Sequence, residues 1–217
     1  MKNKTKEKRA FTLIELLVVI SILGILMGIV GPKVIDLLSG SEKTKVQAIV
    51  RGWVTQLHQY KAHYGYFPPF LLSVEEGAPV SLAEPDNYDN FLISLKGKSM
   101  SEDGTWMPVE VGHQQNRKGK EFHSFSEDEF DAGGKLIGAD NIMIIVDQDG
   151  DGTITLDDGL VNEILQSLAV DYSSTEIQAI DSDKFAKLRE KVAVFILDDD
   201  DLDVQNVFSW NIEKFFD

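Results

Sequence analysis

The chain has 217 residues and a net charge of −15, with 36 acidic and 21 basic side chains and no cysteine. This acidity argues against binding to the phosphate backbone of nucleic acids, which requires clustered Lys and Arg. The lack of cysteine excludes disulfides as a source of stability. About 150 residues follow the apolar and amphipathic segments at the N-terminus, which is enough for one domain.

The chain begins with a basic leader, residues 1–10, that runs into an apolar segment. Between positions 11 and 32, Glu15 is the only charged residue. As a helix this segment extends about 33 Å, enough to cross a hydrocarbon core of about 30 Å. The basic residues of the leader favour a cytoplasmic N-terminus. We therefore predict a single membrane-spanning helix over residues 11–33, with the chain after Lys33 outside the cytoplasm.

Glu15 needs a separate explanation. A carboxylate within a membrane helix costs about 2.5–3.5 kcal/mol on insertion scales and normally has a partner. A secretory signal peptide fits poorly, because the apolar run is long and no A-x-A cleavage site follows it. Cleavage between Ala10 and Phe11 would instead free the α-amine of Phe11. That cation, on the same chain or on a neighbour, would be the partner of Glu15.

Residues 11–20 read Phe-Thr-Leu-Ile-Glu-Leu-Leu-Val-Val-Ile and follow the basic leader directly. This combination resembles the type IV pilin and type II secretion pseudopilin family. The resemblance implies that a prepilin peptidase cleaves after Ala10, where the family usually has Gly, and then methylates Phe11. It implies that Glu15 pairs with the amine of an adjacent subunit in a filament. It also implies that a cytoplasmic ATPase extracts the subunit through an inner-membrane assembly platform protein.

Three further residues of this helix have predicted packing roles. Gly24 and Gly28 have the small-xxx-small spacing that lets membrane helices approach closely. Pro32, after a glycine, predicts a weakened or kinked turn, and the resemblance implies that the helix loosens there in the filament. Beyond it, apolar residues recur at three- and four-residue spacing. Residues 34–64 are therefore predicted to continue the same helix with an amphipathic face.

The head begins at residue 65. Residues 65–140 hold five of the six prolines, which predicts a long, irregular connection with short elements. An apolar run over residues 142–146 predicts a strand, and a twelve-residue motif for calcium follows it. Oxygen ligands are expected at positions 1, 3, 5, 7 and 12 of this motif. They are the side chains of Asp147, Asp149, Asp151 and Asp158 and the backbone carbonyl of Thr153.

The calcium motif departs from an EF-hand in two ways. Position 12 is Asp158 where Glu is usual, which predicts weaker binding or a changed coordination geometry. A strand enters the loop where an EF-hand has a helix, although residues 159–169 are predicted to form the exiting helix. The alternative is an acidic turn held open by water. We favour Ca²⁺, which would stabilise the head in place of disulfides.

The C-terminal part alternates helix and strand signals. Ser173 and Glu176 predict a capping box that opens a helix towards Lys191, and residues 192–197 predict a strand. The segment 206–211 resembles the strand that closes many pseudopilin heads, although Gln and Asn replace the usual two aspartates. An acidic run before it is either a second metal site or a solvated loop. Its acidic members are Asp198, Asp199, Asp200, Asp201 and Asp203.

No nucleophile, zinc or phosphate-loop signature occurs, so an enzyme is not expected. The predicted fold is α+β and type IV pilin-like, with a long N-terminal helix packed on a small antiparallel sheet head that carries the calcium loop. The predicted function is a pseudopilin-like subunit of a secretion filament based in the inner membrane, which the lack of cysteine favours. The alternatives are a type IV pilus pilin and a non-polymerising bitopic calcium-binding protein. The predicted divisions are the leader 1–10, the membrane half 11–33, the amphipathic half 34–64 and the head 65–217.

Overall fold

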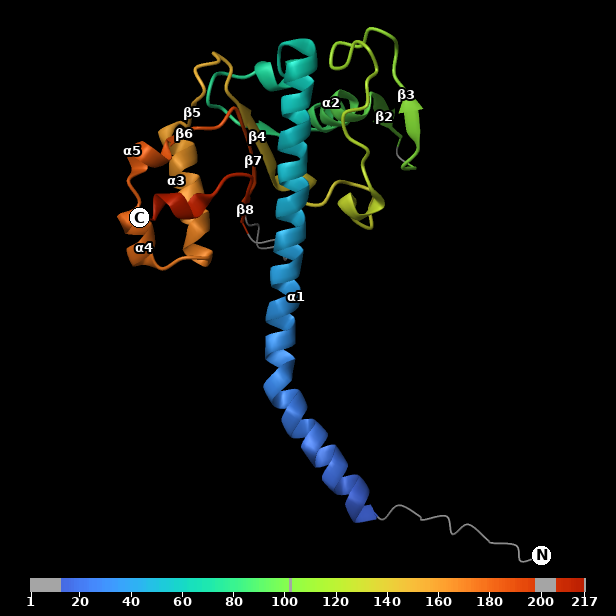
Figure 1. Cartoon of the computed structure of the whole chain (residues 1–217), viewed down its shortest axis with the longest axis vertical. Coiled ribbons are helices and arrows are strands. Elements are labelled where there is room, and N and C mark those ends of the chain that lie inside the picture. Colours follow the sequence, from blue (N-terminus) through green and yellow to red (C-terminus); the bar gives the residue numbers. More distant parts are fainter. Residues whose placement is uncertain (1–12, 102, 198–205, 217) are drawn as a thin grey trace, which may run out of the picture. The chain divides into compact units, whose positions relative to one another are not determined.

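The computed structural model describes residues 13–101, 103–197 and 206–216, with the side chains of all of these except residues 15, 28–42 and 170. The chain divides into two units, residues 1–42 and 43–217. One helix, α1, belongs to both units, and the rest of the second unit forms the head (Figure 1).

The N-terminal helix α1 extends over Leu13–Tyr64 without interruption, as the sequence predicts. Gly24, Gly28 and Pro32 all lie within it. In the first unit its described large apolar side chains, from Leu13 to Met27, are exposed. Within the described part of the chain, no helix has the length and apolarity of a membrane span.

The head is built on a four-stranded antiparallel sheet with the strand order β1-β4-β7-β8. The central strands β4 and β7 pair along their full lengths, with Ile144 opposite Val194. They confirm the strands predicted at residues 142–146 and 192–197. The strands are β1 (Val80–Ser81), β4 (Ile142–Val146), β7 (Val192–Ile196) and β8 (Val207–Phe208).

Both faces of this sheet are buried, and successive residues divide between two cores. Ile144 and Val194 belong to the first core, and Ile145 and Phe195 belong to the second. Neighbouring residues of a strand point to opposite faces, so a sheet covered on both sides needs apolar residues at every position. This is why the two central strands are uniformly apolar and show no alternation with polar residues.

The first core joins the sheet to the second half of α1 and to α2 (Pro85–Lys96). Trp53, Leu57 and Tyr60 of α1 are almost completely buried. Their spacing of three and four residues places them on one side of the helix, which is the amphipathic face that the periodicity predicts. The ring of Trp53 meets Phe91 of α2 edge-on, with 5.4 Å between centroids.

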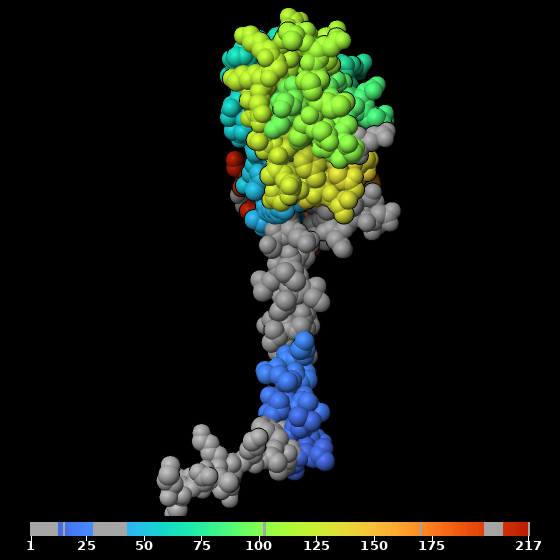
Figure 2. All heavy atoms as spheres, turned by 90° about the vertical axis from the view of Figure 1, so that its right-hand side faces the viewer, coloured from blue at the N-terminus to red at the C-terminus, as the bar shows by residue number. Residues whose placement is uncertain are grey.

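The connection over residues 65–140 is more ordered than the sequence predicts. It contains α2, which begins with Pro85 and ends at Gly97, where φ is 71°. The buried Asn116 fastens the loop that follows, because its amide donates to the carbonyls of Ser94 at 3.0 Å and Lys120 at 2.7 Å. Figure 2 shows this connection, from green to yellow, covering one face of the head. It also contains β2 (Lys98–Met100), β3 (Trp106–Pro108) and 3₁₀ helices at Pro69–Leu72, Glu127–Glu129 and Ala139–Asn141.

The second core lies on the other face of the sheet, under short C-terminal helices and the two-stranded β5–β6 sheet. The predicted capping box of Ser173 and Glu176 is confirmed. The helix that it opens ends at Ala179, much earlier than predicted, because Ile180 is extended and Asp181 caps a new helix. The elements are β5 (Ile154–Thr155), α3 (Asp158–Ser167), α4 (Ser174–Ala179), α5 (Ser182–Phe185), β6 (Lys187–Leu188) and 3₁₀ helices at Leu168–Val170 and Ile212–Phe215.

A buried carboxylate ties α1 to the connection. Glu129 is 5% exposed, and its Oε2 accepts a hydrogen bond from the indole N–H of Trp53 at 2.8 Å. Its Oε1 accepts from the backbone N–H of Ser126 at 2.9 Å, and Nε2 of His123 lies 2.8 Å from Oε2. Burial alone would raise the pKa of Glu129, but the bonds from His123, Ser126 and Trp53 outweigh it and hold the pKa below 4.5.

We predict that Glu129→Gln lowers the free energy of unfolding at pH 7 by about 1–3 kcal/mol, because buried donors lose their charged acceptor. The folded pKa of Glu129 lies below its unfolded value, so its contribution is present above the unfolded pKa and is lost as the pH falls through the folded pKa. Urea unfolding over a pH series measures this difference. The exposed Glu127→Gln, in the same 3₁₀ helix, is the control, and a deficit of E129Q that does not change with pH would contradict the assignment.

Candidate functional site

The candidate site is the acidic loop between β4 and α3. Asp147 follows the last residue of β4, and its backbone N–H donates to the carbonyl of Lys191 at 3.0 Å, which extends the pairing with β7. The strand thereby holds the side chain of Asp147 in a buried position, 1% exposed. Asp149 and Asp151 are exposed. The loop thus has one carboxylate at its base and two at its rim.

The buried carboxylate of Asp147 organises the turn. Its Oδ1 accepts a hydrogen bond from the backbone N–H of Gly150 at 2.7 Å, and its Oδ2 accepts one from Gly152 at 3.1 Å. Both glycines have positive φ angles, 81° and 88°, which residues with a Cβ adopt only at a cost. The glycines therefore let the backbone fold around Asp147.

The two rim carboxylates are oriented in the same way. Oδ1 of Asp149 accepts from the N–H of Asp151 at 2.9 Å, and Oδ1 of Asp151 accepts from the N–H of Thr153 at 2.6 Å. Asp147, Asp149 and Asp151 each have an oxygen within 4.8 Å of those of the other two. Ligands at about 2.4 Å from one calcium ion lie at most about 4.8 Å apart, so these three carboxylates fit a hard cation.

The other two predicted ligands lie at the end of the loop. Asp158 is the first residue of α3, is exposed, and is not one of the three grouped carboxylates. Its neighbour Asp157 is the N-cap of α3 and accepts from the N–H of Leu160 at 2.9 Å. Ligation by Asp158 and by the carbonyl of Thr153 stays a prediction. The exiting helix is confirmed, since α3 (Asp158–Ser167) begins one residue before the predicted segment 159–169 and covers most of it.

A fourth carboxylate beside the loop was missed by the sequence analysis. The pKa of Glu76 is raised, first by desolvation and then by the charges of Asp149, Asp151 and Asp147. The side chain of Gln148 donates to the carbonyl of Val74 at 3.2 Å and so ties this segment to the loop. Glu76 precedes the loop by many residues and belongs to no motif, so no signal in the sequence indicates this position.

The remaining predicted site residues are only partly described. Ala10 and Phe11, the predicted processing site, lie outside the described residues. Glu15 lies within α1, but its side chain is not described. The predicted second metal site is also outside the described residues. Its members are Asp198, Asp199, Asp200, Asp201 and Asp203.

Comparison with known families identifies the N-terminal segment. Residues 5–31 match the family model described as the prokaryotic N-terminal methylation motif. This motif indicates a type IV pilin-like precursor with a class III prepilin leader. No curated protein and no solved structure matches the chain.

The prepilin motif indicates how the subunit is processed, anchored and assembled. A type IV pilin-like leader implies processing by prepilin peptidase and assembly with other pilin subunits. It also indicates a membrane-anchored, structural subunit more than an enzyme. The α+β architecture of the head, with its long N-terminal helix and antiparallel sheet, is compatible with a pilin-like fold.

Proposed function

We propose that the chain is a pseudopilin-like subunit that polymerises into a filament based in the inner membrane and drives protein secretion. The observation that carries this proposal is the prepilin motif over residues 5–31, which contains both the processing site and Glu15. The uninterrupted α1 supports it, because one helix joins this motif to the head. The absence of cysteine favours a secretion pseudopilin over a pilus pilin, whose C-terminal region usually carries a disulfide.

The apolar part of α1 would first anchor the subunit in the inner membrane, with the basic leader in the cytoplasm. The support is a segment over residues 11–33 whose only acidic residue is Glu15 and whose described apolar side chains are exposed. Prepilin peptidase would then cut between Ala10 and Phe11. The membrane anchor keeps the processed subunits in one plane until a cytoplasmic ATPase, acting through the platform protein, moves them into the filament.

Glu15 would guide each subunit into the filament. An unpaired carboxylate in hydrocarbon is costly, and the amine of a processed Phe11 is a cation of the right sign on the same segment. Pairing Glu15 with Phe11 of a neighbour removes two unpaired charges from the apolar surroundings at once. A subunit at any other axial position leaves both charges unpaired, so the pair selects the correct position.

We also propose that the loop from Asp147 to Asp158 binds Ca²⁺ and stabilises the head. The support is the group of three carboxylates, together with the oxygen-only chemistry that hard cations prefer. The loop connects the central strand β4 with β5 and α3, so a bound ion would hold the sheet and the second core together. This is the role that a disulfide would have in a chain with cysteines.

The assembly proposal predicts that Glu15→Ala abolishes the filament but leaves the subunit processed and in the membrane. Filaments recovered from cells, with immunoblots of membrane fractions, measure both outcomes. Asp36→Ala is the control, since it removes an acidic residue of α1 beyond the apolar segment and should leave assembly intact. Normal filaments with Glu15→Ala, or a subunit found only as a membrane monomer in the unaltered protein, would contradict the proposal and favour a non-polymerising anchor.

The calcium proposal predicts that millimolar Ca²⁺ raises the melting temperature of the purified chain by roughly 5–10 °C over the value in a chelator. Asp149→Asn with Asp151→Asn should abolish this shift, because two carboxylates of the group lose their charge. Asp157→Asn is the matched control, since Asn is an equally good helix cap and the residue is not in the group. Equal shifts in both variants, or none in the unaltered chain, would refute a calcium site.

A further inference from the structure

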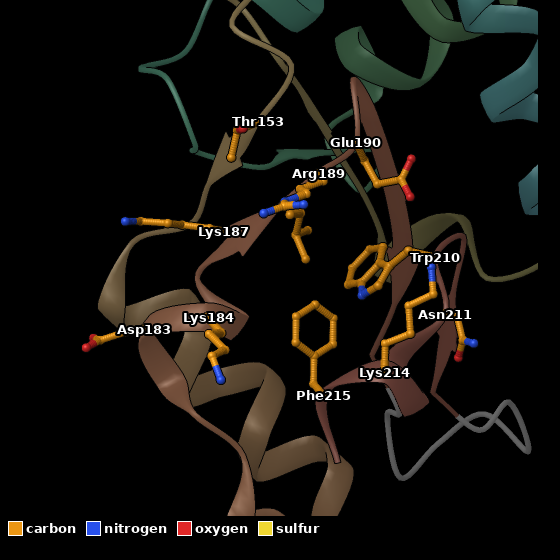
Figure 3. Close-up of a pocket in the computed structure, with 11 residues that line it drawn as sticks. Thr153, Asp183, Lys184, Lys187, Arg189, Glu190, Trp210, Asn211, Lys214 and Phe215 are labelled. Carbon is orange, nitrogen blue, oxygen red and sulfur yellow. The ribbon is translucent and has the colours of Figure 1, made fainter. Parts of the chain in front are cut away.

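A pocket of about 820 Å³ opens in the C-terminal part of the head (Figure 3). Its walls come from the two-stranded β5–β6 sheet and the residues beside it, from α5 and from the segment that contains Trp210 and the 3₁₀ helix at Ile212–Phe215. This volume lies within the range of about 300–1,000 Å³ that is typical of small-molecule sites. The prepilin motif assigns no occupant to this pocket, and ligand binding there would not depend on filament assembly.

Three apolar side chains line part of the pocket, and two of them are aromatic. Trp210 and Leu188 are buried, at 5% and 1% exposed, and Phe215 is half-buried. The indole of Trp210 packs against Phe208, with 4.9 Å between centroids. The ring of Phe215 packs against Phe185, 5.0 Å away. Neighbouring aromatic rings therefore hold the lining in place.

The indole nitrogen of Trp210 is a buried donor. It has no hydrogen-bond partner among residues 13–101, 103–197 and 206–216. Figure 3 shows it pointing into the pocket, on the side of the Phe215 ring. Buried indole N–H groups normally find a partner, as that of Trp53 does with Glu129 at 2.8 Å. The missing acceptor is therefore expected to come from an occupant of the pocket.

The rim of the pocket is positively charged in a strongly acidic chain. Lys184, Lys187, Arg189 and Lys214 line it, against Asp183 and Glu190. Lys184 pairs with Asp181 at 3.4 Å. For the described side chains, Lys187, Arg189 and Lys214 are in no ion pair. Arg189 reaches over the pocket from the residue after β6 (Figure 3). An occupant with a negative charge would complement these free cations.

We propose that this pocket binds an organic carboxylate with an apolar or aromatic body. The carboxylate would accept from the indole N–H of Trp210 and from the guanidinium of Arg189, which suits the planar, two-oxygen geometry of a carboxylate. The apolar body would lie against Leu188 and Phe215. An inorganic anion would satisfy the donors but would leave the apolar side chains of Leu188 and Phe215 uncovered. The ligand is either a free organic acid or the C-terminal carboxylate of a polypeptide.

The indole N–H signals of the full chain, in detergent micelles, test this directly by NMR. The chain has three tryptophans, and Trp210 is the one predicted to respond. Phenylacetate represents a free acid and N-acetylphenylalanine represents a polypeptide C-terminus. We expect saturable shifts of the Trp210 signal with either probe, while Trp53, already bonded to Glu129, stays unchanged. The probe that binds more tightly identifies the source of the carboxylate.

Three controls separate carboxylate binding from apolar binding alone and from a general effect of surface charge. N-acetylphenylalaninamide has no charge and should leave the Trp210 signal unshifted. Arg189→Gln should weaken binding of N-acetylphenylalanine by about tenfold, because a charge-assisted hydrogen bond is lost. Lys135→Gln, which removes an exposed cation elsewhere on the head, should not change it. No saturable shift of Trp210, equal binding of the uncharged amide, or an equal response to inorganic phosphate would overturn the proposal.

Discussion

The head depends on the burial of the central strand pair β4 and β7 on both faces. The second half of α1 and α2 cover one face, and α3 and α5 with the two-stranded β5–β6 sheet cover the other. All five residues of β7 are buried, so a single polar substitution there would disturb one core or the other. The same strand pair also positions the acidic loop and the pocket, because Asp147 directly continues β4 and Trp210 follows β8, the neighbour of β7.

The two candidate binding features of the head have opposite charge and adjoin through Thr153. Its backbone N–H donates to Asp151 in the acidic loop, while the residue also lines the basic pocket. Both features belong to the half of the head that packs as the second core. The first core has a different task, since it fixes the head to α1 through Trp53 and its neighbours. One face of the sheet thus attaches the head to α1, and the other face carries the acidic loop and the basic pocket.

The sequence predicted the elements that are determined by residues close together in the chain. The long helix, the two central strands, the capping box at Ser173 and the acidic loop all follow from periodicity, capping or ligand spacing. The helix α2 was missed although Pro85 and Gly97 mark its ends, because the surrounding prolines suggested an irregular segment. The position of Glu76, and an indole of Trp210 that finds no acceptor among the described residues, arise only from tertiary packing, which spacing along the chain does not encode.

The proposed pairing of Glu15 with Phe11 requires removal of the leader, and the mass of the mature chain tests this removal most directly. Intact-protein mass spectrometry would be applied to the subunit extracted from its native membrane. If prepilin peptidase processes the subunit, as the N-terminal methylation motif leads us to expect, the chain begins at Phe11 and carries one additional methyl group. A chain that still begins at Met1 would contradict it, because an uncut leader leaves no amine at Phe11 for Glu15 to pair with.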